Sequence, residues 1–294
     1  MQVVVADKLS VRYAYGDAVG GAVLQGYGEI FLDSRTSNLG KAFRASGLAR
    51  RAAVATLLKP GEYQFVSVET PNVPAAEVKA AMRWKLKELI DFPVEEATYD
   101  ILAIPPQSGA AASHQYAYVV ASNNALIRSY MTRFDEARIG LTTIDVPETA
   151  QRNISALFEQ EGRGLGLLFM DESGGLLTLT AGGELLLSRR IEVTPSQIEQ
   201  ALPEEREDLF ERVLLNLQRT IDGFERQFSQ VVVGRLMCGP AADDCGLSSF
   251  LAAYLGIKVE ALDLASVMKV PEGMDLAAQA RFFHLIGCTL RGQA

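Results

Sequence analysis

The chain has 294 residues, of which 48% are hydrophobic and 22% are charged. This composition is typical of a globular protein with a large core, and it excludes a mostly disordered chain. The 28 Lys and Arg residues against 36 Asp and Glu residues give a formal net charge of −8. Because an acidic surface repels the phosphate backbone, we expect no nucleic-acid partner.

The sequence contains no segment that predicts a membrane span or a secretion signal. No apolar run reaches the roughly 18–20 residues that cross a bilayer, so we expect no direct membrane insertion. Residues 1–7 lack the basic and long apolar regions of a signal peptide, which favours a cytoplasmic location. Cys238, Cys245 and Cys288 show no CxxC spacing. They indicate a reducing compartment, and we expect all three to be core residues.

In chain order, the first half of the sequence alternates strands with helices. Short apolar runs predict strands, at 2–6, 10–15, 21–31, 52–57, 63–68, 97–104, 115–121 and 141–146. Helical spacing of apolar residues predicts helices, at about 37–47, 74–90, 123–137 and 147–158. Ser34 to Ser37 are N-cap candidates for the first of these helices, and Gly47 is a stop signal.

The pattern restarts after the polar, glycine-bearing segment 159–164, which is the best candidate for a domain boundary. Three strands are predicted first, at 165–170, 175–181 and 184–191. A long helix, a strand, a helix, a strand and a final helix follow, at 204–228, 231–237, 246–255, 258–262 and 276–290. Because both halves begin with three strands and then alternate, the sequence predicts two related α/β units with mixed sheets.

Four groups of stretches carry a resemblance to a known family: 66–71 with 78–85 and 90–100, then 121–123 with 144–150, then 217–225, and finally 238–241 with 250–257. In this order they resemble the PilM family of type IV pilus biogenesis, and within it the MshI-type proteins of mannose-sensitive haemagglutinin (MSHA) pili. The first group is similar to the strand–helix unit that forms the small inserted subdomain of that family, called 1C. Together the four groups span nearly the whole chain.

The resemblance implies an α/β, two-domain actin-like (RNase H-like) fold with a nucleotide cleft between the domains. The first domain would be 1–159, with an inserted 1C-like subdomain at about 60–121, and the second would be 160–294. Members of the family lie on the cytoplasmic face of the bacterial inner membrane. They bind the N-terminal tail of a PilN-like membrane protein and connect it to other proteins of the pilus assembly platform.

The resemblance also locates the expected nucleotide site. Actin-like enzymes hold phosphates with two β-hairpin turns of the pattern Asp-x-Gly, in which glycine lets backbone amides approach the phosphates. In one register the family's aspartates fall on Val5 and Phe169, and its glycines fall on Asp7 and Asp171. In the other register Asp7 and Asp171 are the aspartates, but both glycines are still replaced. The sequence therefore predicts a degenerate cleft and a pseudo-ATPase without a cofactor.

The residues that would form this degenerate cleft are Asp7, Lys8, Ser10, Asp171, Ser173, Gly174, Gly239 and Ala241. Gly239 and Ala241 belong to a turn that resembles the adenosine-side segment of the family. We expect no metal ion, and Asp7 and Asp171 are the ligands if one binds.

The predicted helix at 74–90 carries a candidate partner groove, formed by Arg83, Trp84 and Lys87. Tryptophan and arginine are enriched at binding hot spots. Packing of Trp84 in the core is the alternative interpretation. The two histidines, His114 and His284, are interpreted as a loop residue and a helix residue and not as a metal or catalytic pair.

Three hypotheses of function remain. The first is a scaffold without enzymatic activity that binds the tail of a PilN-like protein where the inserted subdomain meets the first domain. The second is an ATPase or nucleotide switch in which Asp7 and Asp171 hold Mg²⁺. The third is a filament-forming protein.

Overall fold

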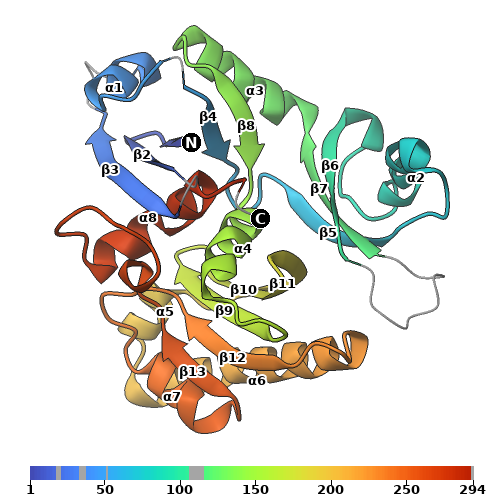
Figure 1. Ribbon diagram of the computed structural model, residues 1–294, viewed down its shortest axis with the longest axis vertical. Helices are drawn as coiled ribbons and strands as arrows, with labels where there is room; N and C mark the ends of the chain where they lie inside the picture. The colour runs from blue at the N-terminus through green and yellow to red at the C-terminus, as the bar shows by residue number, and fades with distance from the viewer. Residues whose placement is uncertain (18–20, 33–37, 51, 106–115, 293–294) are drawn as a thin grey trace.

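Two five-stranded mixed sheets form the body of the molecule (Figure 1). The computed structural model describes residues 1–17, 21–32, 38–50, 52–105 and 116–292. The first sheet has the order β3-β2-β1-β4-β8, and the second has the order β11-β10-β9-β12-β13. In each sheet three strands form an antiparallel meander, one later strand pairs in parallel with its first strand, and a second later strand pairs in parallel with that one. The same arrangement therefore occurs twice, as the repeated pattern predicts.

The strands of the first sheet are β1 (Gln2–Ala6), β2 (Ser10–Asp17), β3 (Val23–Phe31), β4 (Val54–Leu57) and β8 (Leu141–Asp145). Those of the second are β9 (Gly164–Asp171), β10 (Gly174–Ala181), β11 (Glu184–Ile191), β12 (Val233–Cys238) and β13 (Lys258–Ala261). Because successive side chains of a strand point to opposite faces, each sheet contributes to two cores. In β1, Val3 and Val5 belong to the core between the sheets, whereas Val4 and Ala6 belong to the outer core of the first sheet.

Two helices, α4 (Pro147–Phe158) and α8 (Leu276–Thr289), fill the space between the sheets. α4 follows the first sheet in the chain but packs on β9, β10 and β11, and α8 follows the second sheet but packs on β1 and β2. The two helices also pack on each other, and they meet at Gly287. A Cβ atom at Gly287 would lie 2.1 Å from the carbonyl oxygen of Ala150, so only glycine permits this approach.

The outer faces of the two sheets are covered by different helices. On the first sheet, Phe43 of α1 (Leu39–Ala45) and Phe134 of α3 (Asn124–Glu136) are buried. On the second sheet, Leu217 of α6 (Pro203–Gln227) and Leu251 of α7 (Leu247–Tyr254) are buried, with α5 (Pro195–Gln200) beside them. Each sheet is thus a middle layer with helices on both faces, as α/β folds require.

A third sheet, of order β5-β7-β6, forms a smaller inserted subdomain. Its elements are β5 (Gln64–Glu69), α2 (Ala75–Leu86), the 3₁₀ helix η1 (Val94–Glu96), β6 (Ala97–Ala103) and β7 (Tyr116–Asn123). Met82 and Leu86 of α2 pack on one face of this sheet. Tyr118 and Phe65 lie in the core that contains β11, so the subdomain contacts the second sheet as well as the first. The exact division of the chain near residue 159 stays a prediction.

The structure corrects several expectations. The first helix is shorter than 37–47 because Asn38 caps it, and Ser34 to Ser37 lie outside the described residues. The second helix ends at Leu86, not at residue 90, and a turn continues to the buried Ile90. The short helix α5 and the 3₁₀ helix η2 (Leu264–Ser266) were not predicted.

The three cysteines are free thiols. Cys238 and Cys288 are buried as expected, but Cys245 is a partly exposed loop residue with a φ of 53°. The prediction that all three are core residues is therefore wrong for Cys245.

Within the ranges given above, no helix has both the length and the apolar character needed to cross a membrane.

Candidate functional site

The tips of two corresponding hairpins, β1–β2 and β9–β10, face one cavity of about 480 Å³ between the two sheets. Asp7 lines it from the first tip, and Asp171 and Ser173 line it from the second. Arg12, Lys59 and Arg281 contribute basic side chains to the same cavity. A cavity thus lies between the two hairpin tips, and both candidate metal ligands line its wall.

The carboxylate of Asp7 is already neutralised by the protein. Lys59 Nζ donates a hydrogen bond to Asp7 Oδ1, and Arg12 Nη2 lies 3.3 Å from Asp7 Oδ2. Burial acts to raise the pKa of Asp7, but the hydrogen bonds and charges of Lys59 and Arg12 outweigh it and hold this pKa below its ordinary value. A metal ion at Asp7 would have to displace two bound cations.

One amide at each hairpin tip is also engaged within its own turn. The Asp7 amide donates to the Ser10 carbonyl at 2.8 Å, and the Ser173 amide donates to Asp171 Oδ1 at 2.7 Å. Asp171 therefore stabilises its own turn. Gly174 adopts a φ of +105°, where a Cβ would lie 2.5 Å from the Ile191 carbonyl oxygen, so this glycine serves hairpin geometry. Ser10 is buried in β2 and only 6% exposed.

An aromatic stack fills the inner end of the cleft. Phe169 is 4% exposed, and its ring lies 4.2 Å from the ring of Phe283, centroid to centroid. His284 packs against Phe169 edge-on at 5.0 Å. The Phe169 ring also lies against Gly239, where a Cβ would come within 2.6 Å of it. Phe169 thus lines the same cavity as the hairpin tips and also packs against the turn at Gly239.

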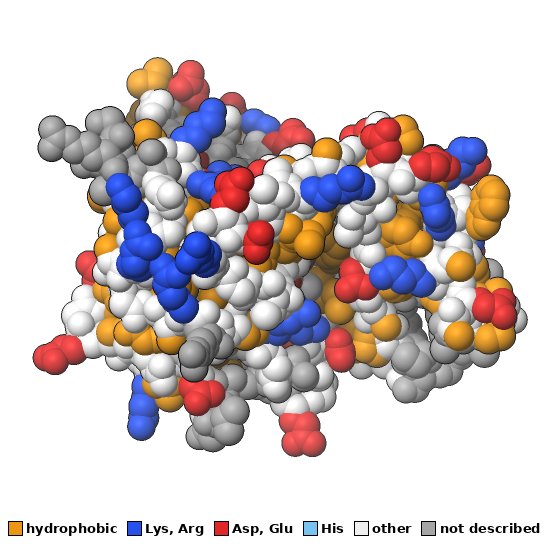
Figure 2. All heavy atoms as spheres, turned by 90° about the horizontal axis from the view of Figure 1, so that it is seen from above, with side chains coloured by type: hydrophobic (Ala, Val, Ile, Leu, Met, Phe, Trp, Pro, Cys, Tyr) orange, Lys and Arg blue, Asp and Glu red, His pale blue; other side chains and the backbone are white. Residues whose placement is uncertain are grey.

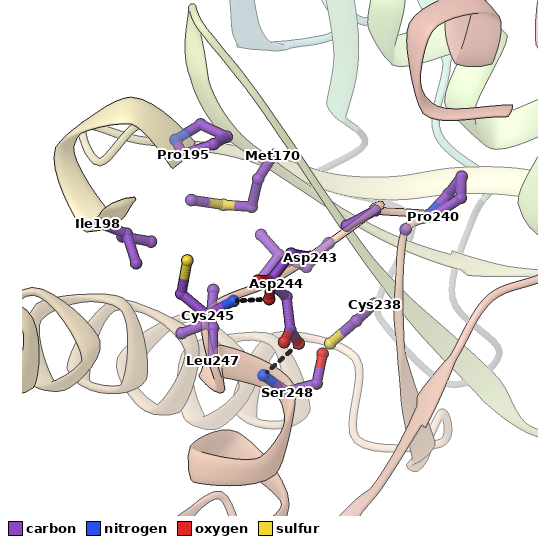
Figure 3. A pocket seen from close by; sticks show the side chains of 13 residues that line it. Met170, Pro195, Ile198, Cys238, Pro240, Asp243, Asp244, Cys245, Leu247 and Ser248 are labelled. Carbon is purple, nitrogen blue, oxygen red and sulfur yellow. Dashed lines mark hydrogen bonds between the residues drawn. The ribbon is translucent and has the colours of Figure 1, made fainter. Parts of the chain in front are cut away.

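Gly239 and Ala241 line a separate cavity on the outer face of the second sheet. Figure 3 shows this cavity, with Met170, Ile198 and Leu247 among its labelled walls. Its volume is about 70 Å³, and its apolar walls include Met170 and Ile198. A cavity of roughly 150 Å³ holds benzene, so this one is too small for a purine as it stands. The eight predicted cleft residues therefore do not form one nucleotide-shaped cavity.

The polar groups of this small cavity are committed to its loop. Asp243 Oδ1 accepts from the Cys245 amide at 2.8 Å, and Asp244 Oδ2 accepts from the Ser248 amide at 2.8 Å (Figure 3). Burial acts to raise the pKa of Asp244, but the hydrogen bonds from Ser248 and the neighbouring amides lower it overall. Burial raises the pKa of the Cys238 thiol to about 11. Both carboxylates therefore stabilise the loop itself.

A third cavity, a groove of about 440 Å³, opens where the first sheet meets α3, beside the entry to the inserted subdomain. Its lining includes Lys8 at the first hairpin tip, Glu62 before β5, and Leu126, Tyr130 and Arg133 on α3. Seen from above, the molecular surface is hollowed beside the inserted subdomain, where hydrophobic side chains are bordered by charged ones (Figure 2). Lys8 thus lies in this groove and not in the cleft.

The walls of the groove are held by specific hydrogen bonds. Tyr130 Oη donates to Glu62 Oε2 at 2.7 Å, and burial together with this carboxylate raises the pKa of Tyr130. Arg133 donates to the carbonyl oxygens of Ala6 and Asp7, at 2.9 and 3.2 Å. The groove is therefore preformed by contacts between α3, the segment before β5 and the first hairpin.

Sequence reasoning missed a buried cluster that joins three parts of the chain. Tyr63 Oη donates to Glu148 Oε2 at 2.5 Å, and Arg190 Nη2 donates to Tyr63 Oη and to Glu148 Oε1, both at 2.9 Å. Glu148 is only 2% exposed. Burial and the adjacent carboxylate raise the pKa of Tyr63. No spacing in the sequence indicates this contact, because its members are far apart in the chain.

A second link ties the inserted subdomain to β11. Tyr118 Oη donates to the Leu186 carbonyl at 3.2 Å and accepts from the Ser188 amide at 3.3 Å. Burial raises the pKa of Tyr118 to about 12.

The residues predicted to form a partner groove lie elsewhere. Arg83 and Trp84 are exposed on α2, Lys87 is exposed just after it, and none of the three lines the groove between the first sheet and α3. Trp84 is 78% exposed, so the interpretation of Trp84 as a core residue is wrong.

Of the two histidines, His284 lies in the part of the chain that the structure describes, whereas His114 lies outside it. Burial lowers the pKa of His284 to about 3, with the charges of Arg190 and Arg12 acting in the same direction. Its ring is therefore neutral at ordinary pH. Among the described residues, no three His, Cys, Asp or Glu side chains are grouped closely enough to hold a metal ion.

No protein-family model and no curated protein matches the sequence. Among solved structures, the chain is similar to a chain of the PilM–PilN type IV pilus biogenesis complex, with a TM-score of 0.73 and 17% identity over 100% of this chain and 98% of that one. It is also similar to the cytoplasmic domain of EpsL, an inner-membrane component of the type II secretion system of Vibrio cholerae. In that comparison the TM-score is 0.51, the identity is 10%, and 98% of this chain and 93% of that chain are covered.

These likenesses, together with the repeated sheet order, confirm at the level of architecture the resemblance to PilM. The chain has an α/β, two-domain actin-like fold with a small inserted subdomain.

Proposed function

We propose that this protein is a cytoplasmic scaffold of a type IV pilus assembly machine, of the MSHA type, and that it binds the N-terminal tail of a PilN-like inner-membrane protein. The groove between the first sheet and α3 carries the proposal, because it opens beside the inserted subdomain and is preformed. The solved complex of PilM with PilN, which has a similar fold, supports a partner of this kind. Tail binding would hold the protein at the membrane without a membrane segment of its own and would connect it to other platform proteins.

The chemistry of the groove suits an extended peptide. Peptide recognition needs an apolar surface, a few hydrogen-bonding groups and no catalytic residue. Leu126 supplies apolar surface, while Lys8 and Ser129 supply polar groups at the rim. Lys8 has no ion-pair partner among the described residues, which leaves its ammonium group available to a carbonyl or carboxylate of the peptide.

Loss of nucleotide turnover is the second part of the proposal. Asp7 is paired with two basic side chains, one amide at each hairpin tip is engaged within its turn, and Phe169 lines the cavity and packs against Gly239. Each of these features opposes a bound nucleotide and its metal ion, so the fold serves binding of proteins.

Calorimetric titration with a synthetic peptide of the cytoplasmic tail of a PilN-like protein from the same cell tests the docking site. We expect saturable heat for the wild type. Ser129→Trp should weaken binding at least about tenfold, since an indole would fill the groove. Met131→Trp is the matched control, because Met131 is exposed on the same helix and does not line the groove. No heat at high micromolar peptide, or equal loss in both variants, would contradict the proposal.

One observation favours the alternative of a nucleotide-binding ATPase or switch: Asp7 and Asp171 line the same cavity. A thermal-shift series with ATP and Mg²⁺ separates the two functions. The scaffold proposal predicts an unchanged Tm. A rise in Tm that disappears in Asp7→Ala, measured against that variant's own Tm without nucleotide, would instead establish a working nucleotide site.

A further inference from the structure

The outer face of α2 presents a large apolar side chain between basic ones. Trp84 is 78% exposed, and Arg83 and Lys87 beside it are exposed as well. The opposite face of α2 is buried through Met82 and Leu86, so the exposed face is not needed for folding. With about 100° between successive residues, Ala80, Arg83, Trp84 and Lys87 fall within about 100° of the helix circumference. They form one continuous surface, which we name the α2 face.

The two cations of the α2 face lack counter-charges. Lys79 and Lys85, the other basic residues of this helix, lie within 4.0 Å of Asp100 and Glu69, at 3.7 and 3.3 Å. In the described part of the chain, no carboxylate lies within that distance of Arg83 or Lys87. On a protein with a net charge of −8, two unpaired cations beside an exposed indole mark a place for an acidic surface.

The first half of α6 carries the complementary surface. Glu204, Asp208, Glu211 and Leu215 recur at the spacing of one helix face and are all exposed, Leu215 to 46%. None of the three carboxylates has an ion-pair partner among the described residues. We name this set the α6 face. Figure 1 shows α2 at the outer end of the inserted subdomain and α6 on the far side of the second sheet, so the two faces of one molecule do not meet.

We propose that the α2 face of one molecule binds the α6 face of a second copy. In an antiparallel pairing, Lys87 lies opposite Glu204 and Arg83 lies opposite Asp208, while Ala80 leaves room for the approaching helix. This orientation also brings the C-terminal end of α2 to the N-terminal end of α6, so that the helix dipoles attract. Trp84 is covered by the partner helix and supplies most of the buried apolar area.

The contact joins two different surfaces, so each added copy leaves one α2 face and one α6 face free unless the assembly closes on itself. A single pair of helices buries less area than a stable dimer needs, so association is weak and is seen at tens to hundreds of micromolar protein. Because exposed ion pairs contribute, association weakens as salt shortens the Debye length from about 10 Å at 0.1 M to about 3 Å at 1 M.

Sedimentation velocity on the full chain, at about 5 to 200 μM protein and at low and high salt, tests this interface. We expect concentration-dependent association of the wild type. Arg83→Glu/Lys87→Glu should remain monomeric, and so should Glu204→Arg/Asp208→Arg. An equimolar mixture of these two variants should associate again, because each α2 face then meets an α6 face of opposite charge. Trp84 is the only tryptophan, so its emission should shift to the blue whenever association occurs.

The control variant Arg44→Glu/Arg128→Glu changes the net charge by the same amount as Arg83→Glu/Lys87→Glu, at exposed positions on α1 and α3 that lie outside both faces. It should associate like the wild type. A wild type that stays monomeric at the highest concentration overturns the proposal, as does association that survives both charge reversals or a mixture that stays monomeric. Ser129→Trp leaves both faces intact, so failure here is distinguishable from failure of tail binding.

Discussion

The cluster of Tyr63, Glu148 and Arg190 allows the coupling between the inserted subdomain and the two sheets to be measured. Arg190→Met removes the only cation within 4.0 Å of the Glu148 carboxylate among the described residues, while the carboxylate stays 2% exposed. Removing one partner of a buried ion pair lowers the free energy of unfolding by about 3–5 kcal/mol. Because the Arg190 side chain is 32% exposed and Tyr63 still donates to Glu148, we expect the lower end, about 3 kcal/mol.

Urea unfolding followed by circular dichroism measures this loss of the free energy of unfolding. Arg189→Met is the control, since Arg189 is exposed on the same strand. The double variant Arg190→Met/Glu148→Met removes both charges, so it should be more stable than Arg190→Met, but it should stay about 1–2 kcal/mol below the wild type because the Tyr63 hydroxyl then lacks both partners. If Arg190→Met loses less than about 1 kcal/mol, or if the double variant is no more stable than the single one, the cluster does not hold a desolvated charge.

Two further predictions concern packing and pH. Gly287→Ala should destabilise the protein by about 3 kcal/mol, because the new Cβ would clash with the Ala150 carbonyl. Gly223→Ala in α6 should instead stabilise it by about 0.5–1 kcal/mol, because a Cβ there would meet no atom within 4 Å. Thermal or urea unfolding measures the free energy of unfolding of both variants. The pKa of His284 is about 3 in the folded chain, where the ring is buried, and about 6.5 in the unfolded chain. Between pH 6.5 and pH 3 the unfolded chain therefore binds a proton that the folded chain does not, and the free energy of unfolding falls as the pH falls. From pH 7 to pH 5 the wild type should lose about 2 kcal/mol more than His284→Gln, and equal losses in urea titrations would contradict burial of a neutral ring.

The order of strands and long helices is predictable from the sequence, because hydrophobic periodicity reports which residues face a core. β1 illustrates this: Val3 and Val5 point to one core, and Val4 and Ala6 point to the other. The helix α5 has only six residues and little periodicity, but its start does carry a sequence signal, a capping box of Thr194 and Gln197 with Pro195 at the first helical position, which apolar periodicity does not detect. The exposure of Trp84 was not predictable either, because an apolar residue type alone does not reveal whether a helix position faces the sheet or the solvent.

The candidate cleft was only partly predictable. The replacement of glycine at both hairpin tips is visible in the sequence, and so is the presence of Asp7 and Asp171. The pairing of Asp7 with Lys59 is not visible, because 52 residues separate them and the parallel pairing of β1 with β4 brings them together. The packing of Phe169 against Gly239 likewise depends on how β12 lies beside β9. Contacts between distant segments follow from topology, and local spacing does not encode them.

The positions of α4 and α8 bear on any attempt to study the halves of this molecule separately. A fragment that ends near residue 160 would lack α8, so Val3 and Val5 would be exposed to water. The remaining fragment would in turn lack α4, which covers β9 to β11. Proteolysis at the polar segment 159–164 should therefore leave two pieces that stay together until denaturant separates them, whereas each piece produced alone should aggregate. Independent production of the first half would require α8 to be joined to it, as in a circular permutation.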